Sequence, residues 1–555
     1  MTGPAPGDAE AADPVMSVAW HSVAVREAAG QAAAKLAAEY VAPALAAKDP
    51  GLWGPGASGE AAMRLGWLDA PRASLALLGL LAVLASRARE DGLDHVVLAG
   101  TGGSSVAPEV ISRASRVPLT VLDTTDPHPV VQALADRLEH TLVVVSSKSG
   151  TTVGTDSLRR IYEQAFAGLG LAPHEIARRF VVVTDPGSPL EHTAHEAGYH
   201  VVPADPNVGG RYSALTASAL VPAALAGADV SALLAEAEAV LPALASADGN
   251  PGLELGAALG GYALAGHDKV VLAGCAPGLP GFAGWAEQLI AESTGKQGRG
   301  ILPVVVGGED APGFSPGPDI HLVALGTPGR PADTSVTGRL GAQFLVWEYA
   351  VAIAGRLLGI NPFDQPDVAE PAENTARILA EAGEKPLATG VPTFTDGAVD
   401  VYSGAGLLPA SGGLAELLDA LLIGLPDRGY LAIMAYLDRD GDRAVTGLRD
   451  ALAARTTHPV TFGWGPQLAH STGQYHKGGP RNGVFLQITG AIEHDIQVPG
   501  RDFSLGKLQL AQALGDLRAL HQRGRPAVRL HLRDRAAGLS QLLDAARAST
   551  NGALR

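Results

Sequence analysis

Short apolar runs alternate along this chain with longer Ala- and Leu-rich segments. Each run has the length and the Val/Leu content of a strand buried in a parallel sheet, and the segments between them have the length of helices. The first series of predicted strands is 95–99, 119–122, 142–146, 180–184 and 199–202. The second series is 269–273, 302–306 and 320–325, followed by a long helix at 340–358. This alternation predicts doubly wound parallel sheets.

A third α/β series follows residues 384–412, which are rich in Pro, Gly and Thr and predict a linker or a surface excursion. Its expected elements are strand 430–437, helix 446–456, strands 459–464 and 484–488, helix 505–522, strand 527–532 and helix 538–549. The fold class is therefore α/β, with two doubly wound parallel-sheet subdomains and a C-terminal α/β domain. The predicted boundaries are 1–45 for an N-terminal helical extension, 46–235 and 236–385 for the two subdomains, and 386–555 for the C-terminal domain.

Composition narrows the class of protein. With 555 residues, 46 % of them hydrophobic, the chain can build three or four domains. A formal net charge of −16 argues against nucleic acid or an anionic membrane as a partner. The single cysteine, Cys275, excludes intrachain disulfides. Residues 1–15 lack the pattern of a signal peptide, and the apolar run 75–86 is too short to span a bilayer and predicts a buried helix, so we expect a cytoplasmic protein.

The segment LVVVSSKSGTTVGT at 142–155 is the most informative stretch. A buried strand runs into a loop of hydroxyl side chains, one glycine and Lys148, just before a predicted helix at 155–167. Free N–H groups and the helix dipole make such a position suitable for a single phosphate on a small molecule. The alternative is an ordinary βα turn capped by Ser or Thr.

Four further segments carry candidate chemistry. They are VVLAGTGGSS at 96–105, NVGGRYS at 207–213, WAEQLIAESTGK at 285–296 and GINPFDQ at 359–365. Arg211, between two glycines and Tyr-Ser, indicates a cation held over a pocket. Glu292 stands at the C-terminal end of a predicted helix, where the helix dipole would raise its pKa and suit it to act as a general base. Taken singly, each segment also has a purely structural explanation.

Together these segments, in this order, resemble the glucose-6-phosphate isomerase family, which is built on two sugar-isomerase (SIS) domains. The segments VGGRYS and GINPFDQ carry the resemblance most specifically. The resemblance implies that Arg211 stabilises the reaction intermediate and that Glu292 is the base. It also implies a set of substrate-binding residues: Gly103, Ser104, Ser147, Lys148, Ser149, Thr152 and Gln365. It calls for no cofactor and no metal.

The chain departs from the family pattern after Gln365. The lysine that typical members carry seven residues after this glutamine is Ala372 here, and the usual histidine segment before the glutamine is missing. A similar string, HSTGQYHKGGP, occurs at 470–480, in a predicted loop, and resembles a string in transaldolase–glucose-6-phosphate isomerase fusions. We expect His470 and Lys477 to be catalytic and Gln474 to bind substrate. The alternative is a polar surface loop.

The favoured function is reversible isomerisation of glucose 6-phosphate and fructose 6-phosphate through ring opening and a cis-enediol. A dual phosphoglucose/phosphomannose isomerase would use the same groups, and a non-catalytic sugar-phosphate sensor would need the phosphate loop alone. The expected partner is a small sugar phosphate, with a homodimer possible. The presence of Arg211 together with Glu292 favours an enzyme over a sensor, because a sensor needs no base.

Overall fold

The computed structural model describes residues 15–367, 369–404 and 412–548. Its first sheet consists of parallel strands in the order β3-β2-β4-β5-β6. The strands are β2 (His95–Gly100), β3 (Thr120–Leu122), β4 (Thr141–Ser146), β5 (Phe180–Thr184) and β6 (His200–Pro203). The connecting helices include α6 (Gly103–Ser115), α7 (Pro127–Ala135), α8 (Val153–Gly168), α10 (Pro189–Ala197) and α11 (Ala217–Leu225). Every residue of β2, β4 and β5 is buried, as their continuous apolar pattern requires.

The second sheet has the order β1-β10-β9-β7-β8. Its strands are β1 (Met16–Trp20), β7 (Lys269–Gly274), β8 (Leu302–Val306), β9 (Ile320–Leu325) and β10 (Thr334–Gly338). The expectation of a helical, peripheral N-terminal extension is wrong for β1, which pairs antiparallel with β10 and forms the edge strand of the sheet. Helix α1 (Val23–Ala38) follows and packs along α13 (Pro251–Leu264). The acidic start of the chain, up to residue 14, lies outside the described residues.

The third sheet has the order β11-β12-β16-β15-β13-β14. Its strands are β11 (Phe394–Asp396), β12 (Val399–Ser403), β13 (Tyr430–Tyr436), β14 (Val460–Trp464), β15 (Gly483–Gly490) and β16 (Ala527–Leu532). Its helices are α17 (Leu414–Ile423), α18 (Gly447–Ala453), α19 (Thr472–Gly478), α20 (Leu505–Gln522) and α21 (Arg535–Arg547). The expected linker at 384–412 is only partly a linker, because β11 and β12 form a hairpin on the edge of this sheet. Residues 405–411 of that segment are not described.

All three sheets share one winding order. In each, the first parallel strand is central, the second lies on one side of it, and the third and fourth lie on the other side. The carboxyl ends of the first and third strands flank the point where the winding reverses, which is where open α/β sheets bind ligands. The α/β class with doubly wound parallel sheets is thereby confirmed.

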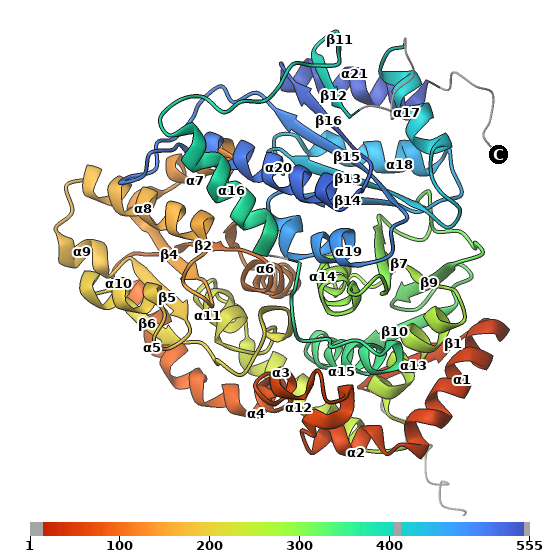
Figure 1. Cartoon of the computed structure of the whole chain (residues 1–555). Helices are drawn as coiled ribbons and strands as arrows, with labels where there is room; N and C mark the ends of the chain where they lie inside the picture. The colour runs from red at the N-terminus through yellow and green to blue at the C-terminus, as the bar shows by residue number, and fades with distance from the viewer. Residues whose placement is uncertain (1–14, 368, 405–411, 549–555) are drawn as a thin grey trace, which may run out of the picture.

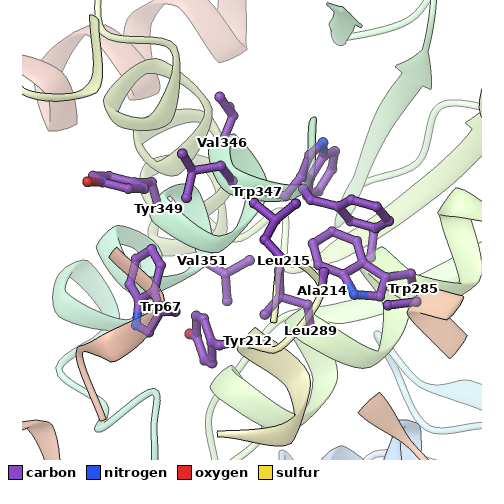
Figure 2. Close-up of a cluster of buried hydrophobic side chains, with 14 of the residues drawn as sticks. Trp67, Tyr212, Ala214, Leu215, Trp285, Leu289, Val346, Trp347, Tyr349 and Val351 are labelled. Atoms are coloured by element: carbon purple, nitrogen blue, oxygen red, sulfur yellow. The ribbon is translucent and has the colours of Figure 1, made fainter. Parts of the chain in front are cut away.

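The long buried helix α15 (Leu340–Leu358) organises the core below the first two sheets. It packs against α12 (Val230–Leu244), α13 and α14 (Phe282–Thr294) (Figure 1). Figure 2 shows Trp67, Tyr212, Trp285 and Trp347 in this apolar core. Trp67 lies against Tyr212, with ring centroids 5.1 Å apart. Arg211 directly precedes Tyr212, so the packing of Tyr212 in the core also fixes the backbone that carries Arg211.

Among the described residues, the face of the third sheet that is turned toward the second sheet shares its apolar core with that sheet. One apolar cluster joins Val271 and Leu322 of the second sheet to Met434 and Phe485 of the third. Another joins the first sheet to Val498 and Leu505 of the C-terminal segment. The domain boundaries at 45, 235 and 385 stay a prediction.

One helical stretch among the described residues, Ser58–Glu90, is long and apolar enough by composition to cross a membrane. Its mean hydropathy is 1.6, and 33 % of its most apolar window is buried. A single stretch of this kind also occurs in soluble proteins, so it assigns no membrane span. The expectation of a buried helix at 75–86 holds for one face only, since Leu75 is 43 % exposed and Val83 is 47 % exposed.

Candidate active site

The loop between β4 and α8 presents hydroxyl groups at the carboxyl edge of the first sheet. Ser147 Oγ and Thr152 Oγ1 lie 3.1 Å apart. Thr152 occupies the N-cap position of α8, yet its side chain makes no capping bond. The alternative of a simple Ser/Thr-capped turn therefore does not describe this loop, since the Thr152 hydroxyl is not used to cap the helix.

Lys148 is the cation of this loop. Its Nζ donates to Asp185 Oδ1 at 2.7 Å and to the carbonyl of Asp205 at 2.8 Å. Burial lowers the pKa of the Lys148 ammonium, and the Asp185 carboxylate acts in the opposite direction. The two contacts hold the ammonium at the edge of the hydroxyl loop.

The glycine loop after β2 approaches other backbone closely. A Cβ at Gly103 would overlap the backbone of Gly210, just before Arg211. A Cβ at Gly102, whose φ is +64°, would come within 2.9 Å of the Cβ of His470. Only glycine permits this approach, which brings the first sheet, the arginine segment and the C-terminal domain together.

Arg211 lies in a 3₁₀ turn at Gly210–Tyr212, and its side chain is 1 % exposed. Its Nε donates to Ser293 Oγ at 2.9 Å, and its Nη2 donates to the carbonyls of Pro362 and Asp364 at 2.5 and 3.1 Å. Its Nη1 has no hydrogen-bond partner among the described residues and lies 3.9 Å from Glu292 Oε2. The guanidinium is thus fixed on two sides and presents one free edge beside the carboxylate.

Glu292 lies in the last turn of α14, and its side chain is 3 % exposed. Burial raises the pKa of this carboxyl to about 7, while Arg211 and Lys296 act in the opposite direction. The expected rise is found, but its main cause is burial and not the helix end. A carboxyl with this pKa can both take up and release a proton near neutral pH.

The loop at 361–365 is held by two buried cations. Lys296 Nζ donates to the carbonyls of Asn361 and Asp364 at 2.7 and 2.6 Å and to Asp364 Oδ1 at 2.6 Å. Burial, followed by the Arg211 charge, lowers the pKa of Lys296 to about 7. Together with Arg211, Lys296 fixes the loop that carries Gln365.

The segment 470–480 is helical, so the expectation of a loop is wrong. A 3₁₀ turn at Gln467–His470 leads into α19. Gln288 Nε2 donates to the carbonyl of His470 at 2.8 Å and so joins α14 to this segment. Burial, followed by the Lys477 charge, lowers the pKa of His470.

These segments enclose one cavity of about 310 Å³. Most of the residues that the sequence singled out line it: Gly103, Ser104, Ser147, Lys148, Ser149, Thr152, Arg211, Glu292, Gln365 and His470. His470 also lines a neighbouring cavity of about 590 Å³, in which Ala372 of α16 (Ala369–Ala382) lies.

Lys477 and Gln474, which we expected to reach the substrate, do not line the 310 Å³ cavity. Lys477 Nζ forms an ion pair with Asp516 Oδ1 at 2.6 Å, and both side chains are 1 % exposed. Gln474 Nε2 donates to Asp367 Oδ2 at 2.7 Å and to the carbonyl of Gly295 at 3.0 Å. Lys477 and Gln474 thus point from α19 toward partners in the protein interior, and nothing in the sequence indicates these partners.

Sequence reasoning missed three side chains that line the cavity, namely Arg64, Asp185 and Gln288. Gln288 precedes Glu292 by four residues on α14, so helical spacing could have found it. Arg64 and Asp185 lie outside the motifs, and no local signal marks them.

Fold and cavity define an α/β enzyme of the phosphosugar isomerase class. The family model described as phosphoglucose isomerase matches residues 87–297. The glucose-6-phosphate isomerase of Rubrobacter xylanophilus is 30 % identical over 375 residues, which cover 55 % of this chain and 86 % of that protein. That of Symbiobacterium thermophilum is 31 % identical over 408 residues, which cover 59 % of this chain and 89 % of that protein.

Two solved structures share the fold. A hypothetical protein from Thermus thermophilus matches with a TM-score of 0.54 and 25 % identity, covering 64 % of this chain and 97 % of that one. A glucose-6-phosphate isomerase from Chlamydia trachomatis matches with a TM-score of 0.53 and 20 % identity, covering 67 % of this chain and 90 % of that one. The chain belongs to the glucose-6-phosphate isomerase family, as its motifs predicted. The likeness of its C-terminal segment to transaldolase fusions stays a prediction.

Proposed function

We propose that this enzyme interconverts glucose 6-phosphate and fructose 6-phosphate through ring opening and a cis-enediol. The observation that carries the proposal is the single cavity in which a hydroxyl loop, the buried Arg211–Glu292 pair, Gln365 and His470 meet. A phosphate sensor would need the loop but not the buried pair, so the arrangement favours catalysis.

Substrate binding is assigned to the carboxyl edge of the first sheet. Ser147, Lys148, Ser149 and Thr152 hold the phosphate at the N-terminus of α8, where backbone N–H groups and the helix dipole favour an anion. Gly103 and Ser104 let the sugar approach the backbone, and Gln365 binds its hydroxyls. Phosphate contacts remote from the reacting carbons align the sugar with the base.

Proton transfer is assigned to Glu292. The ionised carboxylate removes the proton from C2 of the open-chain aldose and returns it at C1, and the proton of the C2 hydroxyl passes to the C1 oxygen, so that the carbonyl moves to C2. Between the two carbon proton transfers the enediolate oxygen carries negative charge. The free Nη1 edge of Arg211, whose side chain is 1 % exposed, stabilises this charge.

Ring opening is assigned to His470. The cause of its lowered pKa, burial, keeps the imidazole neutral near pH 7, so it can take or give the proton that ring opening moves. We reassign Lys477 and Gln474 from substrate contact to support of α19, since both bond to interior groups. The chemistry needs no cofactor or metal, and we propose a cytoplasmic location, a small sugar phosphate as the only substrate class, and a possible homodimer.

The test is an NADP-coupled assay of glucose 6-phosphate formed from fructose 6-phosphate. We expect Glu292→Gln to lower kcat by about 10²–10⁴-fold while KM changes little, as the loss of a general base predicts. Glu196→Gln, an exposed carboxylate on α10, is the control and should match the wild type. Near-normal turnover in Glu292→Gln would remove Glu292 from this role. Mannose 6-phosphate assayed in parallel decides whether the enzyme is a dual isomerase.

A further inference from the structure

Arg64 reaches the cavity from outside the sheets. It follows the short helix α3 (Ser58–Ala62), and its side chain lines the 310 Å³ cavity together with Lys148 and Ser149. Arg64 also lines an adjoining hollow of about 420 Å³ that Glu60 and Gln365 border. Arg64 therefore lies where the hollow meets the cavity.

The Arg64 backbone is anchored to the segment that carries Arg211. The N–H of Gly66 donates to the carbonyl of Asn207 at 3.1 Å. Trp67 is fully buried and packs on Tyr212, as Figure 2 shows. These contacts place Arg64 beside the cavity without help from any ligand.

The Arg64 guanidinium is only partly engaged. Its Nε donates to Glu60 Oε1 at 2.8 Å, and its Nη1 donates to the carbonyl of Pro206 at 3.0 Å. Among the residues that the structure describes, none accepts a hydrogen bond from its Nη2. The side chain is 30 % exposed, so one face of the guanidinium can meet a ligand.

Among the described charged residues that line the cavity, Arg64 is the cation whose carboxylate partner lies outside the lining. Of the described lining residues, Arg64, Lys148 and Arg211 carry positive charge, and Asp185 and Glu292 carry carboxylates. Lys148 is paired with Asp185, and Arg211 lies beside Glu292. The partner of Arg64, Glu60, does not line this cavity. A sugar phosphate brings a charge of about −1.5 to −2 at pH 7, and a cation whose own carboxylate lies outside the cavity can offset part of that charge.

We propose that Arg64 binds the phosphate group of the substrate as a second cation, supplied from the N-terminal segment beside Lys148. This inference rests on the proposed function. The planar guanidinium suits phosphate oxygens better than an ammonium group, because its N–H donors form a fixed fork. Arg64 thereby favours phosphorylated sugars over free sugars.

The experiment compares Arg64→Gln and Arg64→Lys with two other variants of the full chain. Arg72→Gln is the matched control, because Arg72 belongs to the same segment but pairs with Glu238 on the exposed surface. Thr152→Ala alters the phosphate loop itself. Each protein is assayed for KM and kcat with fructose 6-phosphate, and its thermal unfolding is followed with and without inorganic phosphate.

We expect Arg64→Gln to raise KM by about ten-fold, the equivalent of a lost charge-assisted hydrogen bond of about 1.4 kcal/mol, with kcat within about two-fold. The rise in Tm that inorganic phosphate causes should shrink in the same variant, since a ligand stabilises only the state that binds it. Arg64→Lys should lie between Arg64→Gln and the wild type, and Arg72→Gln should match the wild type.

The inference is overturned if Arg64→Gln keeps both the wild-type KM and the wild-type phosphate-induced rise in Tm, while Thr152→Ala has a higher KM and a smaller rise in Tm. The unfolding measurement does not depend on turnover. If the wild type does not isomerise fructose 6-phosphate, the proposed function fails, but the phosphate-induced rise in Tm still decides whether Arg64 binds phosphate.

Discussion

Glu292 and Arg211 are the pair of residues on which the proposed chemistry depends. Their closest atoms lie 3.9 Å apart, and neither side chain is more than 3 % exposed. At this separation the guanidinium offsets only part of the desolvation of the carboxylate, so the pKa of Glu292 stays raised, at about 7. The carboxyl that we propose as the base is therefore costly to keep ionised in the folded protein.

This cost predicts a pH-dependent stability. The folded pKa of Glu292 is about 7, above the value of about 4.3 in an unfolded chain. The stability that the protonated Glu292 carboxyl contributes to the folded protein is complete below the unfolded pKa, and it is lost as pH rises through about 7. Glu292→Gln should therefore be more stable than the wild type at pH 8, on the order of 1–3 kcal/mol, and equally stable near pH 4.

Urea unfolding at several pH values measures this difference. Glu196→Gln serves as control, because that carboxylate is exposed and should change stability little at any pH. A difference between Glu292→Gln and the wild type that stays constant with pH would contradict the argument from burial.

Among the elements, α19 shows how a short helix is fixed in the interior. On one side, Gln288 of α14 donates to the carbonyl of His470 just before α19, and Gln474 of α19 donates to the carbonyl of Gly295 just after α14. On the other side, Lys477 pairs with Asp516 of α20, whose second oxygen accepts a hydrogen bond from Tyr436 at 3.2 Å. In Figure 1, α19 lies between the third sheet and α14. These bonds set the position of His470, the residue two before the first turn of α19.

We expect Lys477→Met to destabilise the protein by about 3–5 kcal/mol, because it leaves Asp516 as a buried charge without its ion-pair partner. The double variant Lys477→Met/Asp516→Leu should recover most of this loss, since an apolar pair of similar volume can replace a buried ion pair. Thermal unfolding and the isomerase assay should recover together. If the double variant is stable but still inactive, Lys477 has a chemical role and our reassignment is wrong.

At the scale of the whole molecule, the C-terminal domain completes both the core and the cavity. Its strands share an apolar cluster with the second sheet, and its Val498 and Leu505 join the core of the first. It also brings His470 into a cavity otherwise lined by residues 64–365. Removal of this domain would therefore expose apolar surface and open the cavity to water.

Truncation after residue 385 should accordingly give a poor isomerase that aggregates or unfolds at a lower temperature than the full chain. The physical reason is the loss of the apolar contacts that the two clusters provide. Size-exclusion chromatography and specific activity measure both effects. His470→Ala in the full chain separates the two, since it should lose turnover but keep the fold. A monodisperse, fully active truncated protein would show that the domain is dispensable.

The sequence alone determined the main elements and the local motifs. Helices 340–358 and 505–522 have the predicted bounds, because apolar residues recur along the whole length of each segment. The motif residues from Gly103 to Gln365 line one cavity: the loop residues of the first sheet follow its strands, and Glu292 lies in the last turn of α14. Such information is carried by neighbouring residues in the chain, so it can be read from the sequence.

The tertiary structure decided which edge strands form and where buried charged side chains point, because both depend on residues far away in the sequence. β1 is a strand because it pairs with β10, and β10 pairs on its other side with β9; the patterns of the two segments do not by themselves require strands. Lys477 lies seven residues beyond His470, yet it turns to Asp516, a partner that no spacing reveals. Arg64 lines the cavity, and its segment is held there by the packing of Trp67 on Tyr212, which lies far away in the sequence. Local pattern specifies which element forms, whereas the direction of a buried charge is set by whichever opposite charge the fold brings within a few ångströms of it.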